Sequence, residues 1–251
     1  MSDGALSLSL DQVTVRGRLD AVTAKLSPGS VTAICGPNGA GKSTLLSCLA
    51  GLMKPDRGAV RIGGREITAL PSAQRARTFG YLPQAAELAW DLSVATLVSL
   101  GRLPWRGAPA IEAQAAIDAA IAAVDLDPLR HRPMSQMSGG ERARALMARV
   151  LATQPDWLLA DEPLANLDLA HAATLMRRFR EQAVERRGVV LVLHDLATAM
   201  NHADRVLVLN GGRLVADGSP EQALAGSVIA DIWGVRARWL GEPGQRALSI
   251  G

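Results

Sequence analysis

The sequence predicts an α/β fold in which a helical lobe is inserted into a mainly parallel β-sheet core. Apolar runs with strand character alternate with helical patterns over residues 1–85, and the same alternation returns over residues 155–220. Between these two stretches, residues 86–154 show only helical patterns, and residues 221–251 form a short appendix. We therefore expect a single domain over residues 1–251, made of a two-part core, a helical subdomain and a C-terminal appendix.

The expected elements follow one another along the chain. Residues 1–30 alternate as strands do, and residues 30–35 form a short apolar run that ends at a glycine-rich loop. A helix is expected next, over residues 42–50, and Gly51 would end it. The other predicted strands span residues 59–62, 79–82, 157–160, 189–193, 206–209 and 213–216, and the predicted helices of the lobe span residues 93–100, 111–124 and 141–152.

Length and charge narrow the classes of protein to consider. A chain of 251 residues is long enough for one large α/β domain, with or without a small partner lobe. Its 27 Lys and Arg against 24 Asp and Glu give a net charge of +3, which is typical of an ordinary protein surface, so no nucleic-acid partner is expected. The arginine-rich run at 177–187 is interleaved with Glu181 and Glu185, which indicates the solvated face of a helix.

Several features point to the cytosol. Residues 1–10 lack a basic region and include Asp3, so no signal peptide is expected. No apolar stretch reaches the ~20 residues that a membrane span requires, and residues 113–126 are interrupted by two aspartates. Cys35 and Cys48 lie in apolar surroundings and are expected to be buried free thiols in a reducing compartment. Any role at a membrane is therefore expected to depend on a partner.

A phosphate-binding loop follows the strand at 30–35. Its residues fit the pattern G-x-x-x-x-G-K-[ST]: Gly36, Pro37, Asn38, Gly39, Ala40, Gly41, Lys42 and Ser43. The glycines let successive N–H groups point at phosphates, and the following helix adds the positive end of its dipole. Lys42 supplies a charge for the β- and γ-phosphates, and the Ser43 hydroxyl can ligate Mg²⁺. The alternative, a glycine-rich turn that matches by chance, is disfavoured by the flanking strand and helix.

A second acidic element ends the predicted strand at 157–160. Asp161 at the strand end can hold the Mg²⁺ shell, and Glu162 can orient or deprotonate an attacking water. The alternative for a lone Asp-Glu pair is a surface turn. Pro163 and the preceding apolar run instead place the pair at the carboxyl edge of a sheet, where such folds bind ligands.

A third motif opens the predicted helix at 141–152. Ser138 and Glu141 form the pattern of a capping box, which many ordinary helices have. The same segment presents Ser138 and the amides of Gly139 and Gly140 as an exposed helix N-terminus for an anion. Two glycines lower the stability of a helix start, so their presence here suggests that they serve another purpose. Without side chains they let a ligand approach the backbone closely.

In these motifs and their order the chain resembles the ATP-binding cassette (ABC) family over nearly its whole length. The motifs in chain order are the loop from Gly36 to Thr44, Gln84, the signature Ser138-Gly139-Gly140-Glu141, the pair Asp161-Glu162, the loop Leu164-Ala165-Asn166-Leu167-Asp168, and His194. The resemblance implies the P-loop NTPase cassette fold, with antiparallel strands at the N-terminus. It also implies an ATPase with ATP and Mg²⁺ as cofactors.

The resemblance also assigns roles to single residues. Gln84 would contact the metal and sense the γ-phosphate, and His194 would hold the γ-phosphate and the attacking water. Asp168 would act across a head-to-tail dimer of two copies of the chain. In that dimer each ATP would lie between one P-loop and the partner's Ser138, Gly139 and Gly140. The metal set implied is Ser43, Gln84 and Asp161, and the catalytic pair is Glu162 and His194.

Two positions depart from the family pattern. The signature usually begins with Leu, and Met137 has a similar volume. The family also tends to place an aromatic ring under adenine, but residues 13–18 contain none, and the only Tyr is Tyr81. Arg16 can stack on a base through its guanidinium. We expect ATP to be favoured over GTP only modestly.

Three functions fit an ABC ATPase: a transporter motor, a soluble ATPase acting on nucleic acid or ribosomes, and a nucleotide-binding regulator without turnover. Soluble members usually carry two cassettes or a long coiled-coil insertion, whereas this chain has one cassette and one compact lobe. Glu162 and His194 together disfavour a regulator without turnover. Salt-dependent DNA binding would favour the soluble ATPase.

A further resemblance favours an importer of metal chelates, such as iron–siderophore, haem or cobalamin, over an exporter. Its residues are Leu92-Ser93-Val94, Val98-Ser99-Leu100-Gly101-Arg102-Leu103-Pro104-Trp105, and in the tail Ile232-Trp233-Gly234-Val235 and Arg246-Ala247-Leu248-Ser249-Ile250. It implies transmembrane permease subunits, an extracytoplasmic binding protein, and a place at the cytoplasmic face of the inner membrane. Leu88, Trp90 and Leu92 are the expected permease-docking groove, whereas Trp105 equally suits packing within the lobe.

Overall fold

The computed structural model describes residues 6–84, 91–165 and 167–251. Within these ranges the strands form three sheets. One is antiparallel, in the order β2 (Leu19–Leu26), β1 (Leu8–Val15), β4 (Arg57–Ile62) and β5 (Arg65–Glu66). The main sheet runs in the order β10 (Arg213–Gly218), β9 (Arg205–Asn210), β3 (Val31–Cys35), β8 (Gly188–Val192), β7 (Trp157–Asp161) and β6 (Phe79–Leu82). The third pairs β11 (Ala237–Leu240) with β12 (Ala247–Ile250).

Every neighbouring pair from β9 to β6 is parallel, and only β10 joins the main sheet antiparallel. The helices are α1 (Lys42–Leu49), α2 (Ser72–Thr78), α3 (Val94–Ser99), α4 (Ala110–Ala122), α5 (Gly139–Leu151), α6 (Leu169–Val184), α7 (Leu196–His202), α8 (Pro220–Ala223) and α9 (Gly226–Trp233). Short 3-10 segments span Ile67–Ala69, Leu100–Trp105, Asp127–Leu129 and Met134–Gln136. The predicted fold class, including the antiparallel N-terminal strands, is confirmed.

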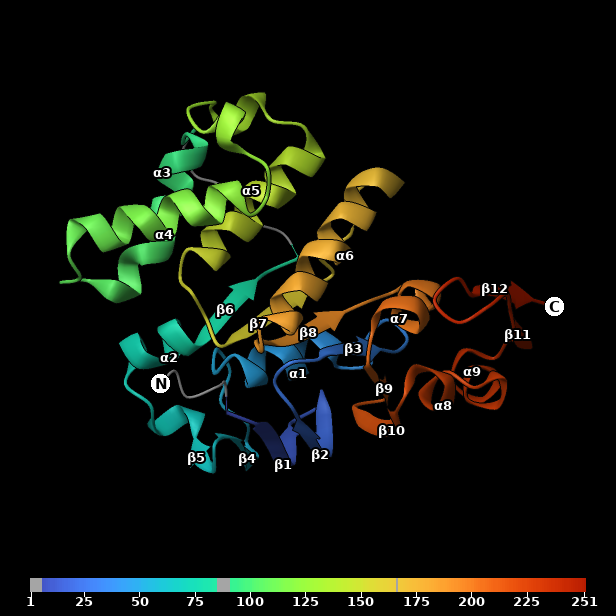
Figure 1. Ribbon diagram of the computed structural model, residues 1–251. Coiled ribbons are helices and arrows are strands. Elements are labelled where there is room, and N and C mark those ends of the chain that lie inside the picture. The colour runs from blue at the N-terminus through green and yellow to red at the C-terminus, as the bar shows by residue number, and fades with distance from the viewer. Residues whose placement is uncertain (1–5, 85–90, 166) are drawn as a thin grey trace.

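The three lobe helices α3, α4 and α5 lie between β6 and β7 in sequence, as predicted. In Figure 1 they gather at one end of the molecule, and the C-terminal elements lie at the other end. Helix α5 begins at Gly139 rather than at 141, because the capping box of Ser138 and Glu141 starts the helix two residues earlier. The arginine-rich run at 177–187 lies largely on α6, where Arg178 is turned inward and forms an ion pair with Asp125 of the lobe.

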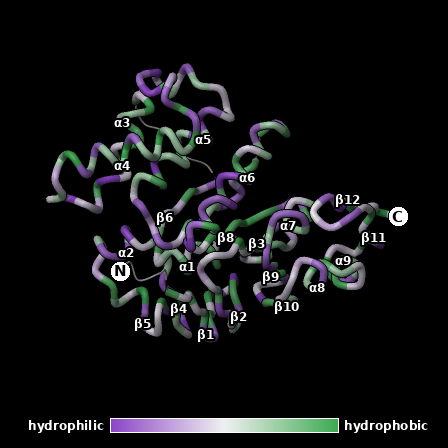
Figure 2. The backbone as a smooth tube through the Cα atoms, in the orientation of Figure 1, coloured by the Kyte–Doolittle hydropathy of each residue, from purple (hydrophilic) through white to green (hydrophobic). Residues whose placement is uncertain are grey.

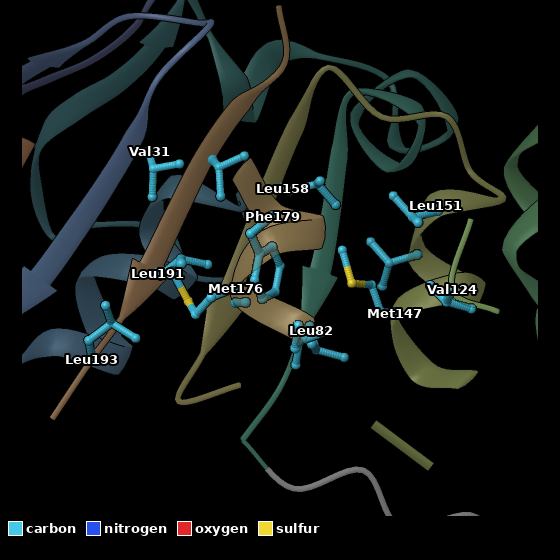
Figure 3. Packing of buried hydrophobic residues seen from close by; sticks show 14 of the residues in the cluster. Val31, Leu82, Val124, Met147, Leu151, Leu158, Met176, Phe179, Leu191 and Leu193 are labelled. Atoms are coloured by element: carbon cyan, nitrogen blue, oxygen red, sulfur yellow. The ribbon is translucent and has the colours of Figure 1, made fainter. Parts of the chain in front are cut away.

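The main sheet divides the apolar interior into two clusters because side chains of a strand alternate between its faces. On β3, Val31 and Ala33 belong to the cluster that also contains the lobe, whereas Ile34 faces α1 and the antiparallel sheet. The central strands β3 and β8 are accordingly hydrophobic along their length (Figure 2). Figure 3 shows side chains of the sheet, of α6 and of the lobe packed together in the first cluster.

Apolar packing and hydrogen bonds hold the C-terminal elements against the main body and against one another. Asn201 on α7 donates from Nδ2 to the Arg246 carbonyl and accepts the Arg246 backbone N–H, both at 2.8 Å. The Trp239 indole donates to the Leu224 carbonyl at 2.7 Å. No helix in the described ranges is long and apolar enough to cross a membrane. Leu88 and Trp90 of the expected docking groove lie outside the described residues, as does Asn166.

Candidate functional site

Four neighbouring parallel strands end at the same edge of the main sheet, and each carries part of the predicted site. Their order in the sheet is β3, β8, β7 and β6. The phosphate loop follows β3, His194 follows β8, Asp161 and Glu162 lie at the end of β7, and Gln84 follows β6. Because carboxyl ends of parallel strands meet at one edge, residues distant in sequence converge there.

The phosphate loop can be built only with glycine at two positions. Gly36 has φ 148°, and a Cβ placed there would lie 2.2 Å from the Leu209 carbonyl oxygen. Gly41 has φ 98°, and its Cβ would lie 2.6 Å from the Arg18 carbonyl oxygen. Any side chain at either position would displace the backbone of a neighbouring segment. The loop is thereby held against β9 and against the turn between β1 and β2.

Lys42 is buried at the first position of α1, with its side chain turned back under the loop. Its Nζ donates to the Gly36 and Pro37 carbonyls, each at 2.9 Å. Burial lowers the pKa of Lys42, while the negative charges of Glu162 and Asp161 oppose that shift. A buried cation is costly unless it is paired. The arrangement concentrates positive charge inside a ring of backbone amides, which suits phosphate. Asn38, Gly39 and Ser43 are exposed, so the outer side of the loop is accessible.

Ser43 and Asp161 come together although 118 residues separate them. The Ser43 hydroxyl donates to Asp161 Oδ1 at 3.2 Å. Asp161 is 5% exposed, and burial raises the pKa of its carboxyl. The donor atoms here are a hydroxyl and a carboxylate oxygen, the hard ligands that Mg²⁺ takes together with water and substrate phosphates. These residues therefore fit the ion that the sequence predicts. Thr44, the next residue of α1, is buried.

Glu162 is held between two side chains. Gln84 donates from Nε2 to Glu162 Oε2 at 2.6 Å, and His194 Nε2 lies 2.5 Å from Oε1. Glu162 also has φ 50°, which is uncommon for a residue with a side chain and is concentrated at functional sites. Its backbone N–H donates to the Val192 carbonyl on β8. Glu162 is mostly buried whereas His194 is half exposed, so the carboxylate is fixed beneath an accessible imidazole. Such a carboxylate can orient a water and accept its proton.

The predicted signature residues form a separate group. Ser138 caps α5: its hydroxyl accepts the Glu141 N–H, and its own N–H donates to the Glu141 carboxylate at 2.8 Å. Asp168 caps α6 by accepting the backbone N–H of His171. In the part of the chain that the structure describes, no hydrogen bond joins Ser138, Gly139, Gly140 or Asp168 to the phosphate loop. The chain thus carries two distinct sets of site residues.

Sequence reasoning missed His171, which lies between Asp168 and the signature. A Cβ on Gly140 would lie 2.2 Å from Cδ2 of His171, so the imidazole ring covers this glycine. Nothing lies within 4 Å of a Cβ at Gly139, whose outer side is open. The one signal in the sequence was the spacing of Asp168 and His171, since a helix cap and the third helical residue are neighbours in space.

The stretch Leu100–Trp105, which carried the importer resemblance, fastens the end of α5 to the core. A Cβ on Gly101 would lie 2.1 Å from the Arg149 carbonyl oxygen, so only glycine fits there. Arg102 donates to the Ala152 carbonyl at 2.7 Å, and the Trp105 indole donates to the Thr153 carbonyl at 2.8 Å. Of the two roles left open for Trp105, docking and packing within the lobe, these contacts favour packing, and the indole also contacts α2 of the core.

The turn after β1 has no aromatic ring beside the phosphate loop. The Arg16 backbone N–H donates to Asp56 at 2.7 Å, and the Arg18 carbonyl packs against Gly41. Tyr81 instead packs partly buried against the apolar cluster that includes α1, and burial raises the pKa of its hydroxyl. Modest discrimination between ATP and GTP stays a prediction.

Comparison with known proteins places these motifs in a family. The family model described as "ABC transporter" matches residues 19–165. The hemin import ATP-binding protein HmuV of Streptomyces coelicolor is 43% identical over 216 residues, which cover 86% of this chain and 77% of that protein. The petrobactin import ATP-binding protein YclP of Bacillus subtilis is 36% identical over 218 residues, covering 86% of each chain.

Solved structures share the fold. One is the ATP-binding cassette MJ0796, described as dimeric in a post-hydrolysis state with ADP and Pi bound. It is 26% identical to this chain, covers 85% of it and 98% of the cassette, and superposes with a TM-score of 0.76.

Proposed function

Because the chain belongs to the ABC transporter family, we propose that it is the ATP-hydrolysing motor subunit of an importer for an iron chelate, with haem the first candidate cargo. Membership in the family makes the chain an ATPase. The observation that carries the choice of importer is the 43% identity to a hemin import ATP-binding protein over most of both chains. The stretch Leu100–Trp105, in which the sequence resembles importer motors, adds support, and Arg102 and Trp105 of this stretch form hydrogen bonds to the end of α5.

In this proposal one chain binds the phosphates of ATP with its loop from Gly36 to Thr44. The loop amides and Lys42 neutralise the β- and γ-phosphates, and Gly36 and Gly41 allow the backbone to reach them. Ser43, Asp161 and Gln84 would hold Mg²⁺, which when bound would offset the charge of the phosphates. Gln84 thereby links the metal to Glu162, the residue to which it donates its hydrogen bond.

Glu162 takes a proton from the attacking water as the water oxygen bonds to the γ-phosphorus and the bond from that phosphorus to the bridging oxygen breaks, which gives ADP and phosphate. His194 contacts the γ-phosphate with its exposed imidazole and keeps the Glu162 carboxylate in place. The buried position of Glu162 limits its rotamers, so the water is oriented before reaction. Turnover rather than binding alone is expected for this reason.

Ser138, Gly139, Gly140 and Asp168 serve ATP bound by a second copy. Two observations support this. The group has no hydrogen bond to the chain's own phosphate loop in the described ranges, and a related cassette is described as dimeric with ADP and Pi. The open side of Gly139 and the capped N-terminus of α5 suit the terminal phosphate of that second nucleotide.

The partners of the chain follow from the proposal that it is the motor of an importer. The motor sits at the cytoplasmic face of the inner membrane through permease subunits, and an extracytoplasmic binding protein delivers the cargo. Support comes from the family and from the relatives described as import ATP-binding proteins. Cargo selection belongs to these partners, so the motor itself is expected to be indifferent to the chelate.

The test is growth on defined iron sources in the organism that encodes the chain. Deleting the gene should abolish growth on haem, or on one iron–siderophore complex, as the only iron source, while growth on ionic iron continues. The wild-type gene should restore growth, and a Lys42→Ala gene should not. Undiminished growth of the deletion strain on every chelate would contradict the proposal, as would a neighbouring permease gene with no gene for a binding protein.

A further inference from the structure

His171 lies where two motifs of the second group meet. It is on the first turn of α6, and its ring occupies the space that a side chain at Gly140 would need. The ring atoms nearest to that space are Cδ2, Cγ and Nε2, at 2.2, 2.3 and 2.7 Å from the ideal Cβ. The imidazole face therefore packs directly on the backbone of the signature segment.

One edge of the same imidazole ring contacts the carboxylate of Asp168. Nδ1 of His171 lies 2.7 Å from Asp168 Oδ1, which also accepts the His171 backbone N–H at 2.8 Å. These bonds, the backbone bond first, lower the pKa of the Asp168 carboxyl, so it is ionised at neutral pH. A carboxylate accepts hydrogen bonds, so Nδ1 carries the proton and Nε2 is the nitrogen on the signature side.

Apart from His171, these two motifs meet through apolar packing and not through hydrogen bonds. Within the described ranges, no hydrogen bond joins Ser138–Glu141 to the segment from Leu164 to His171. Both motifs begin helices, and each is flanked by apolar side chains of the same cluster, Met137 and Ala145 around the signature and Leu164 and Leu167 before Asp168. Within that packing, the imidazole of His171 is a direct contact between the first turn of α6 and the first turn of α5.

We propose that His171 is a positioning residue that makes the signature Ser138–Gly140 and Asp168 one rigid unit, which acts on ATP bound by the second copy. The inference rests on the proposed function, because it requires the shared site. A ring held at one edge by a hydrogen bond and packed at its face on a glycine transmits displacement of either motif to the other. Without the ring, each motif would keep its own hydrogen bonds but shift relative to the other. A misplacement of about 1 Å at a reacting group can lower the rate ~10²-fold.

The experiment places His171→Ala in mixed dimers assembled with the permease subunits. Two affinity tags isolate dimers in which one chain carries Lys42→Ala, so that a single working phosphate loop remains. In the first arrangement His171→Ala is on the opposite chain, so the working loop faces an intact signature. In the second it is on the Lys42→Ala chain, so the working loop faces the altered signature.

ATP hydrolysis in the second arrangement is expected to fall at least ~10-fold below the first, within the effect of misplacing a reacting group. The first arrangement should match a dimer of Lys42→Ala with wild type. His202→Ala, which alters an exposed histidine on α7, should leave both arrangements unchanged. His171→Asn, which keeps a donor for Asp168, should recover more activity than His171→Phe, which keeps only the ring.

Two results would overturn the inference. Equal loss in both arrangements would mean that His171 supports the fold and not the shared site. Loss in the first arrangement alone would mean that it serves the chain's own nucleotide. Ser138→Arg in the same two arrangements separates this failure from failure of the proposed function. If Ser138→Arg depends on the arrangement and His171→Ala does not, only the inference about His171 falls; if neither does, the shared site falls with it.

Discussion

The carboxylate of Glu162 illustrates how a single residue is fixed by its surroundings. Its left-handed backbone conformation costs about 1–2 kcal/mol for a residue with a side chain. The backbone bond to Val192 and the two side-chain contacts, from Gln84 and His194, offset this cost. The residue is therefore held in one orientation before any water reaches it.

We predict that Glu162→Gln lowers the rate of ATP hydrolysis by ~10²–10⁴-fold, the usual effect of losing a general base. ATP binding should persist because the loop and Lys42 are untouched. Phosphate release and nucleotide binding, measured on the same preparations, check both statements. Glu185→Gln, at an exposed glutamate paired with Arg187, is the control and should keep full activity. Turnover of Glu162→Gln at the wild-type rate would remove Glu162 as the base.

The buried carboxylate of Asp161 should lower the stability of the folded protein when no metal is bound, because its negative charge is removed from water. Burial raises its pKa above the ordinary value of 3.8, so the folded chain favours the protonated form. Between the unfolded and folded pKa values the folded state binds more protons, so stability falls as pH rises through this window. Above the pKa that Asp161 has in the folded protein, its carboxyl is ionised in both the folded and the unfolded state, and its full destabilising effect is present.

Asp161→Asn is therefore expected to raise the melting temperature at pH 7 without nucleotide, and the gain should shrink as pH falls towards 3.8. Asp118→Asn provides a control of opposite sign. The side-chain hydrogen bond from Arg130 lowers the pKa of Asp118, so its removal should lower the melting temperature at pH 7. Thermal unfolding from pH 4.5 to 8 tests both variants. An equal or lower melting temperature for Asp161→Asn at pH 7 would contradict the argument.

Residues in contiguous motifs could be predicted from the sequence because local physics defines them. The phosphate loop needs its glycines, and the capping box of Ser138 needs only the next three residues. Contacts through space could not be predicted in this way. Gln84 and Glu162 are 78 residues apart and meet only because β6 and β7 are neighbours in the sheet. His171 over Gly140 depends likewise on how α5 and α6 cross.

At the scale of elements, the short segment Leu100–Trp105 joins the lobe to the core. The guanidinium carbons of Arg77 and Arg102 lie 4.5 and 5.0 Å from the centroid of the Trp105 ring. Arg77 also donates to the Pro104 carbonyl at 2.9 Å. Because Arg77 belongs to α2 and Arg102 to the lobe segment, the indole is shared between the two parts of the chain.

We predict that Trp105→Ala lowers the free energy of unfolding by about 2–3 kcal/mol, less than the cost in a fully buried core because the ring is half-buried. Trp105→Phe keeps an aromatic face for both cations and loses the indole hydrogen bond, so about 1 kcal/mol is expected. Urea unfolding measures both. Leu103→Ala alters an exposed neighbour and should change little. Equal costs for Trp105→Ala and Leu103→Ala would show that the indole contacts do not stabilise the junction.

Elements with strong apolar patterns were predicted well, and weakly patterned ones were not. The strands β3, β7 and β8 are buried at every position, and their sequences are apolar runs. Helix α2 has a single buried residue, Thr78, and therefore no apolar periodicity to detect. The strands β11 and β12 contain only half-buried and exposed residues, and their hairpin is bound to α7 through Asn201.

For the whole molecule, the sequence predicts a helical lobe inserted into the sheet core, and in the structure one apolar cluster runs through both. It contains Leu97, Ile121 and Met147 of the lobe together with Leu158 and Leu191 of the sheet. Figure 3 shows Met147, Leu151 and Val124 beside Leu158 and Phe179. A helical pattern identifies the apolar face of a helix and not the partner of that face, so the sequence could not reveal this continuity.

A shared cluster predicts that lobe and core unfold together, although chains of this length often unfold in parts. Leu97→Ala on α3 removes a fully buried side chain and should cost about 2–5 kcal/mol. Amide hydrogens that exchange only when the whole chain unfolds should then exchange faster by the same factor in α3 and in β8. Leu191→Ala, made from the sheet side of the same cluster, should give the same pattern, and Ile111→Ala at an exposed position of α4 should change neither region. If Leu97→Ala quickens exchange in the lobe alone, the lobe unfolds by itself, and the shared apolar cluster does not couple its unfolding to that of the sheet.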